Sequence, residues 1–121
     1  MATLLVNTGR AIITNRIKGS GTEPLYIGYG TGAGTTGATD TTLFTEIGTR
    51  ITGTSTQQTT STTNDTYQVV GTVTAGSSIT VTNAGLFDNS TSGNLFIKSD
   101  FTSIGLSSGD SIQFTIKASF A

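Results

Sequence analysis

The sequence predicts an all-β protein: an antiparallel β-sandwich, with a jelly roll as the expected arrangement, preceded by one short N-terminal helix. Short apolar runs alternate with turn-forming residues at intervals of about 8 to 12 residues, which is typical of antiparallel sandwiches. The 121 residues include 27 Thr, 13 Ser and 16 Gly, and the abundance of β-branched Thr favours strands. Other Greek-key sandwiches share this strand pattern, so the residues alone leave the topology open.

The composition predicts a thin apolar core. Hydrophobic residues make up 34% of the chain, charged residues 11%, and the formal net charge is −1. The length suits one domain, and a small domain with few apolar residues has little stability to spare. Burial against copies of itself or against a large partner would add stability by mass action. We therefore expect a homo-oligomer or a protein docked on a larger assembly.

The residue types also exclude several classes of function. The chain has no His and no Cys, so we expect no disulfide, no usual transition-metal site and no cofactor. Its seven acidic residues are scattered singly, and no constellation for acid–base or nucleophilic catalysis is present, so we do not expect an enzyme. A loop calcium site near Asp88 stays open.

Charge and hydropathy limit the partners and the compartment. A near-neutral chain without clustered Lys and Arg is not expected to bind nucleic acid. The apolar run Leu4–Val6 is too short for a signal peptide or a membrane span. We expect a protein made in a cytoplasm and kept there until it joins an assembly.

The chain divides into an N-terminal arm and helix, residues 1–20, and a sandwich domain, residues 21–121, which together form one structural unit. We expect residues 1–8 to be extended. The helix is expected over Thr8–Lys18, with the Thr8 hydroxyl as its cap and Gly19 as its stop.

Three isoleucines of this helix, Ile12, Ile13 and Ile17, fall at helical spacing and form one apolar stripe. The stripe predicts either that the helix covers an open end of a sheet or that it docks on a larger assembly.

The first strand of the sandwich is expected over Leu25–Tyr29. The glycine-rich segment that follows contains Gly32, Gly34 and Gly37, which formally match a dinucleotide-binding fingerprint. The match lacks the following long helix that such a site needs, so a surface loop is expected. Tyr26 and Tyr29 are expected in the core, although aromatics beside such a loop could also line a sugar site.

The segment Arg50–Thr63 is nearly devoid of apolar residues and is either an edge strand or a long loop. A flat polar strand has weakly specified register, which would suit pairing with a neighbouring subunit, and Thr52 and Thr54 are the candidates there. Arg50 either pairs with Glu46 across one turn or contacts another subunit.

The second half of the chain carries the clearest strands. Val81–Phe101 predicts a β-hairpin whose polar tip runs from Asp88 to Gly93. The last strand alternates strictly, with one apolar face expected to be buried. That face consists of Ile112, Phe114, Ile116, Ala118 and Phe120.

Two further segments complete the sandwich. Residues 67–75 are expected as a strand with Tyr67, Val69, Gly71 and Val73 on one face. After the hairpin, Phe101, Ile104 and Leu106 are expected to be buried.

The whole chain resembles small virion proteins of tailed bacteriophages, of the capsid-decoration (cement) type and of the tail-fibre-associated type. The segments that carry the resemblance are NTGRAIITNRIKG, LYIGYGTGAG, TDTTLFTEI, DTYQVVGTVTA, ITVTNAGLFD, GNLFIKSDF and GDSIQFTIKASF. The resemblance implies a sandwich, with the jelly roll again as the expected arrangement, that assembles as a homotrimer on the phage particle.

Two functions follow from the resemblance. A capsid cement protein would bridge subunits of the major capsid protein on the outer capsid surface. A tail or tail-fibre component would serve as a structural or adaptor module, with receptor binding as a further role. The candidate interface residues are Leu4, Leu5, Ile12, Ile13, Ile17, Arg50, Thr52 and Thr54.

Overall fold

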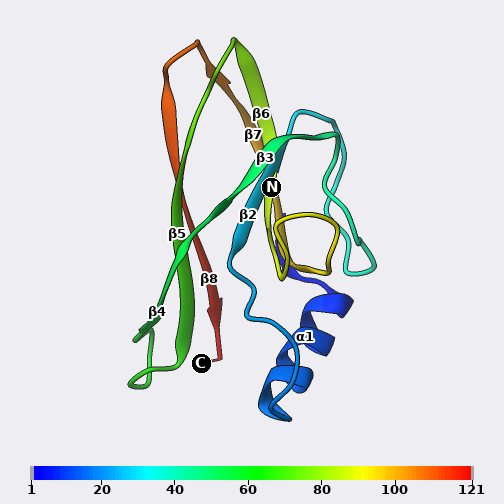
Figure 1. Cartoon of the computed structure of the whole chain (residues 1–121), viewed down its shortest axis with the longest axis vertical. Helices are drawn as coiled ribbons and strands as arrows, with labels where there is room; N and C mark the ends of the chain where they lie inside the picture. The colour runs from blue at the N-terminus through cyan, green and yellow to red at the C-terminus, as the bar shows by residue number, and fades with distance from the viewer. Residues whose placement is uncertain (1, 121) are drawn as a thin grey trace.

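The computed structural model describes residues 2–120 of the chain. Met1, the first residue of the expected arm, and Ala121, the last residue of the expected sandwich domain, lie outside the described residues. The described residues contain one helix and eight strands, and the expected all-β sandwich with a short N-terminal helix is confirmed (Figure 1). The elements are β1 Ala2–Leu5, α1 Asn7–Ile17, β2 Tyr26–Gly30, β3 Glu46–Thr52, β4 Thr54–Gln58, β5 Thr66–Thr74, β6 Ile79–Phe87, β7 Leu95–Leu106 and β8 Ser111–Ser119.

The strands form two sheets in which all neighbours are antiparallel. The five-stranded sheet has the order β1-β7-β6-β2-β3, and the three-stranded sheet has the order β4-β5-β8. The chain passes from one sheet to the other at Gly53, between β3 and β4. A jelly-roll topology is not confirmed by this arrangement.

The expected hairpin is formed by β6 and β7, which pair from Ile79↔Leu106 to Phe87↔Leu95. Its polar tip is closed by Asp88, whose Oδ1 accepts a hydrogen bond from the Asn94 amide at 2.7 Å. Gly93 has φ +71, a left-handed conformation that a glycine adopts without strain. The turn chemistry of the tip therefore fixes the register of the hairpin.

The five-stranded sheet is covered on both faces. On the inner face, Ile27 and Leu86 pack with Val69 of the other sheet. On the outer face, Phe87, Leu95 and further apolar side chains form a separate cluster. This double cover explains why β6 buries every residue from 83 to 87, where a sheet with one wet face would alternate.

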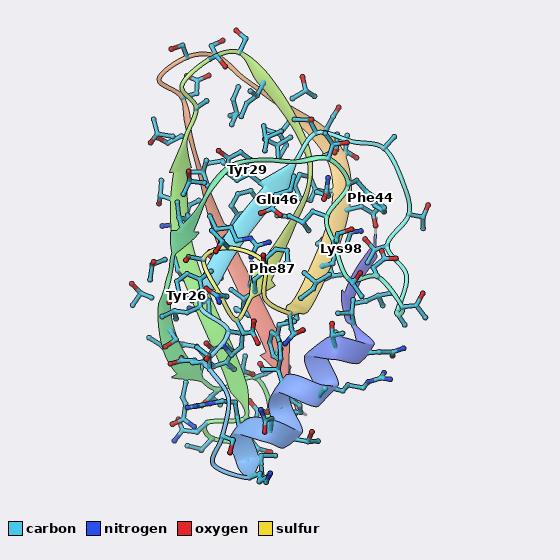
Figure 2. The ribbon with its side chains drawn as sticks, turned by 45° about the vertical axis from the view of Figure 1, so that its right-hand side comes forward. Tyr26, Tyr29, Phe44, Glu46, Phe87 and Lys98 are labelled. Atoms are coloured by element: carbon cyan, nitrogen blue, oxygen red, sulfur yellow. The ribbon has the colours of Figure 1, made fainter. Side chains whose placement is uncertain are left out.

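The outer cover comes from the segment of residues 31–45, whose glycine-rich first part is the surface loop expected from the sequence. Lys98 of β7 holds it: its Nζ lies 2.9 Å from Asp40 Oδ2 and 2.8 Å from the Thr42 carbonyl oxygen. The ammonium also lies 3.4 Å from the Phe44 ring centroid, and Figure 2 shows the two side chains next to each other. A hydrogen bond from the Gly37 amide and another from the Lys98 side chain lower the pKa of Asp40, so the Asp40 carboxyl is ionised at neutral pH.

The predicted face of β5 is confirmed. Val69 and Val73 are buried, Tyr67 packs against the core, and Gly71 faces the Ile27 side chain. The segment whose structure the sequence left open contains the end of β3, all of β4 and a turn that leads to β5. Thus 50–63 is strand for the first part and loop for the second.

The alternation of β8 is also confirmed, but two expected core positions are wrong. Phe120 is 61% exposed and Ile104 is 39% exposed. β8 ends at Ser119, so Phe120 lies beyond the strand. Ile104 lies on a part of β7 that β1 does not reach, because β1 pairs only with residues 97–100.

Helix α1 covers the open lower end of the sandwich (Figure 1). This is one of the two arrangements that its apolar stripe predicted. Ile12 is buried in the core between the sheets. The expected cap is wrong: Val6 occupies the N-cap position, and the Thr8 hydroxyl instead donates to the Leu95 carbonyl oxygen at 2.6 Å. Gly19, with φ +95, follows the C-cap residue Lys18, as expected for a helix stop.

Candidate functional site

The most distinctive surface of the molecule is an apolar groove of about 310 Å³ beside α1. Several parts of the chain form it: the helix, the segment that leads into β2, the first residues of β5 and β7, and Phe120 after β8. We call it the helix groove. Its lining residues are Ile12, Ile13, Arg16, Ile17, Glu23, Pro24, Tyr67, Phe96 and Phe120.

The rings of Tyr67 and Phe96 form a rigid part of the lining. Their centroids are 6.1 Å apart and the planes are nearly perpendicular, at 89°, the edge-to-face geometry that aromatic pairs prefer. The Tyr67 hydroxyl lies 2.9 Å from Glu23 Oε2 and 2.6 Å from the Pro24 carbonyl oxygen. Burial and the hydrogen bond to Glu23 raise the pKa of Tyr67, so this phenol stays neutral and serves to fix the ring.

The rim of the helix groove includes two exposed apolar side chains. Ile17 is 80% exposed and Phe120 is 61% exposed. Single exposed apolar residues are ordinary, but apolar side chains grouped around a groove mark a site for interaction with another molecule. The helix groove is therefore the candidate interaction site of the molecule.

The helix is held close to β7 by its first turn. The Val6 amide donates to the Phe96 carbonyl oxygen at 3.2 Å. Gly9 is buried, and a Cβ at this position would collide with the same carbonyl oxygen. A glycine is therefore required for this close approach, and it positions the groove.

The structure brings only some of the predicted interface residues together. Ile12, Ile13 and Ile17 line the helix groove, and Leu5 packs against the core beside them. Leu4 is half-buried in β1, opposite Lys98 of β7.

Thr52 and Thr54 are exposed on either side of Gly53, where the chain changes sheets. They lie in β3 and β4, and neither strand contributes a residue to the lining of the helix groove. Thr52 and Thr54 are therefore not part of that groove.

Arg50 is engaged within its own chain. Its Nε lies 2.7 Å from Glu46 Oε2, so the expected pairing with Glu46 is confirmed, although on a strand and not across a helical turn. Its Nη1 donates to the carbonyl oxygens of Asn89 at 3.0 Å and Ser92 at 2.6 Å. The guanidinium also lies 3.4 Å from the Phe87 ring centroid. Arg50 thus fixes the hairpin tip to β3.

The sequence did not single out Tyr67, Phe96, Pro24 and Phe120 as groove residues, nor Gly9 as the residue that seats the helix. The alternation of apolar and polar residues predicted that Tyr67 lies in the core and Phe120 on a buried face. Only the position of α1 relative to the strands shows that both residues border a groove. A glycine within a predicted helix, at a cost of up to about 1 kcal/mol relative to Ala, was the one available signal for Gly9.

The remaining candidate sites have structural roles. Tyr29 is buried in the core between the sheets, and Tyr26 packs against the outer cluster. Among residues 2–120, no three His, Cys, Asp or Glu side chains lie together in a way that could hold a metal ion. No helix in that part of the chain has the length and hydropathy to cross a membrane.

Fold and groove together define a small β-sandwich module with an exposed apolar groove beside its helix. A family model described as podophage GP4 fiber I protein gp80 matches residues 11–119. Because the match covers nearly the whole chain, the protein belongs to this family of phage fibre proteins. A search of curated proteins and a search of solved structures give no match.

The family match confirms the sequence-based expectation of a phage virion protein in its broad form. It supports the tail-fibre alternative at least as well as capsid decoration.

Proposed function

We propose that the protein is a structural component of the phage tail fibre that is anchored to a neighbouring virion protein through the helix groove. The observation that carries the proposal is the exposed apolar rim at Ile17 and Phe120, in a member of a fibre-protein family. The protein acts by binding and not by catalysis, and its partners are other virion proteins together with copies of itself. Neither nucleic acid nor a membrane is a partner in this proposal.

The partner presents an apolar side chain or a short apolar segment to the groove. The rigid Tyr67–Phe96 pair lines a preformed site, which lowers the entropic cost of binding. Arg16 and Glu23 at the border of the site supply polar groups of both signs, as expected for the rim of a protein interface.

The test uses two variants that alter only exposed side chains. Ile17→Asp is expected to abolish incorporation of the protein into phage particles, because the partner would have to bury a charge. Thr72→Asp, at an exposed position of β5 outside the groove, is the matched control and should be incorporated normally. Purified variants should melt at the wild-type temperature. Normal incorporation of Ile17→Asp would contradict the proposal.

Capsid decoration is the second candidate function, and the limited apolar content of the chain, 34%, favours it, since cementing the major capsid protein would bury additional surface. In this alternative a homotrimer would sit on the outer capsid surface. Copy number separates the two candidates: a handful of copies per particle indicates a fibre protein, and hundreds indicate a cement protein. Electron cryo-microscopy of intact particles would give the number and the position together.

A further inference from the structure

Strand β8 presents a long, unprotected edge. It is the outermost strand of the three-stranded sheet and pairs with β5 alone, in one unbroken register from Ser111 to Ser119. It contains no Pro and no bulge, and Lys117 is its single charge. Proteins usually blunt such edges with charges, prolines, bulges or very short strands, because an open edge pairs readily with another strand.

Two hydrogen bonds at the ends of the ladder show which backbone groups of β8 are free. The Ala75 amide donates to the Asp110 carbonyl oxygen at 2.8 Å, and the Phe120 amide donates to the Asp65 carbonyl oxygen at 3.0 Å. Both pairs continue the register of β5 with β8. Since hydrogen-bonded and non-bonded pairs alternate in an antiparallel ladder, the even-numbered residues of β8 face β5.

The odd-numbered residues of β8 therefore direct their N–H and C=O groups toward the open edge. Their side chains are all exposed. These residues are Ser111, Gln113, Thr115, Lys117 and Ser119. The edge thus offers a regular series of free donors and acceptors over the full length of the strand.

We propose that β8 pairs in antiparallel fashion with β8 of a second copy of this chain, about a two-fold axis at Thr115. In this register Thr115 faces its own counterpart, Gln113 faces Lys117 of the second copy, and Ser111 faces Ser119. All residues of the strand pair, giving up to about ten new backbone hydrogen bonds. The two three-stranded sheets become one continuous sheet.

Charge selects both the partner and the register. The two Lys117 side chains oppose uncharged Gln113 when the axis lies at Thr115, whereas an axis at Lys117 would place them directly opposite each other. Like charges in directly opposite positions destabilise a strand pair. The edge is otherwise uncharged, so a second copy meets no electrostatic penalty in the longest register.

An apolar crevice along the same side of the molecule favours the same partner. It has a volume of about 220 Å³ and separates β8 from β1 and β7, with Ile97, Phe101, Phe114 and Ile116 among its lining residues. The rings of Phe101 and Phe114 lie 6.4 Å apart there and are half-buried. A two-fold axis perpendicular to the joined sheet places both five-stranded sheets on the same side, so each copy covers the crevice of the other and buries apolar surface.

This contact goes beyond the proposed function, because it concerns self-association and does not use the helix groove. It is a two-fold contact, whereas the resemblance to decoration proteins implies a trimer. An assembly that uses the β8 contact therefore contains an even number of copies, and its formation is measurable on purified protein without the phage.

A disulfide cross-link tests the register directly, because the wild-type chain contains no Cys. Thr115→Cys places two thiols opposite each other, with Cα atoms about 5.5 Å apart in a hydrogen-bonded pair, which is within disulfide range. We expect a cross-linked dimer under mild oxidation. Thr56→Cys is the matched control, since Thr56 is exposed on β4 at the other edge of the same sheet. Failure of Thr115→Cys to cross-link, or equal cross-linking of both variants, would overturn the proposal.

Charge substitutions at Gln113 provide a second test by sedimentation equilibrium. Gln113→Lys creates two like-charge pairs with Lys117 across the axis and should weaken dimerisation about tenfold. Gln113→Glu creates two opposite-charge pairs and should strengthen dimerisation, with an effect that disappears at high salt. Both side chains replace an exposed one, so the monomer should fold as before. A wild-type protein that stays monomeric at millimolar concentration, or identical behaviour of the two variants, would refute the two-fold contact.

Discussion

The two sheets pack against each other through their inner faces but differ in whether their outer faces are covered. The five-stranded sheet carries the segment 31–45 and a second apolar cluster on its outer face. The three-stranded sheet has a bare outer face of polar residues, such as Thr72 and Gln113. In Figure 1, β5 and β8 stand apart on one side, while the loop and α1 lie against the other sheet. Stability is therefore concentrated in the five-stranded sheet, and the three-stranded sheet is free to make contacts.

The largest expected difference concerns the apolar side chains of the two sheets. Leu86 is fully buried in β6, whereas Ile116 is half-buried in β8. Leu86→Ala should lower the free energy of unfolding by about 3–4 kcal/mol, and Ile116→Ala by about 1–2 kcal/mol, because part of its surface already contacts water. Urea denaturation of both variants measures the difference. Equal losses would show that the two sheets contribute alike.

The next effect concerns the lysines on the two sheets. Lys98→Met should cost about 2–3 kcal/mol, because Lys98 is 1% exposed and its removal leaves the Asp40 carboxylate and a loop carbonyl without their partner. Lys117 of β8 is exposed, so Lys117→Met should change stability by less than about 0.5 kcal/mol. Thermal denaturation of the two variants provides the comparison. A similar cost for both would mean that Lys98 does not secure the outer cover.

A smaller effect is expected at the point where β3 holds the hairpin tip. Arg50→Ala removes the ion pair with Glu46 and two hydrogen bonds to carbonyl oxygens of the tip, which should cost about 1–2 kcal/mol. Amide exchange should rise in residues 88–93 and stay unchanged in β8. Arg50→Lys keeps the charge but loses the planar fork, so it should recover only part of the loss. Uniform exchange throughout the molecule would contradict this local role.

The smallest effect is a pH dependence in the turn that joins β4 and β5. Hydrogen bonds from the amides of Thr62, Thr60 and Ser61 hold the pKa of Asp65 well below its usual range. A group whose pKa is lowered on folding adds stability above its unfolded pKa of about 3.9. That stability is lost as the pH falls through the folded pKa. Asp65→Asn should therefore reduce the difference in melting temperature between pH 7 and pH 3. An unchanged difference would exclude this contribution.

The sequence predicted best those parts of the fold that have one buried and one wet face. The alternation from Ser111 to Ser119 gave β8 directly, and the polar tip at Asp88 gave the hairpin, because period and turn chemistry are local properties. The apolar stripe of α1 likewise indicated that the helix covers one end of the sandwich. All three were recognisable without any knowledge of long-range contacts.

The outer cover and the helix groove depend on contacts between distant segments, so local patterns could not reveal them. Lys98 follows the apolar run Leu95–Ile97 and carries no local signal that it pairs with Asp40, 58 positions away. Phe120 continues the alternation, yet the strand ends one residue before it. The candidate site was therefore predicted through its helix residues, while the aromatic lining and the rim beyond β8 were not.

The change of sheet at Gly53 has a mechanical consequence. The chain links the sheets along the β3–β4 margin, and the turns around residues 75–78 and 107–110 link them across the top of Figure 1. Within residues 2–120, no segment of the chain joins the two sheets along the margin formed by β1 and β8. The sheets are therefore covalently linked along the β3–β4 margin and at one end only. Local opening of the sandwich should begin at the β1–β8 margin. A force that separates the two sheets would meet its least resistance there.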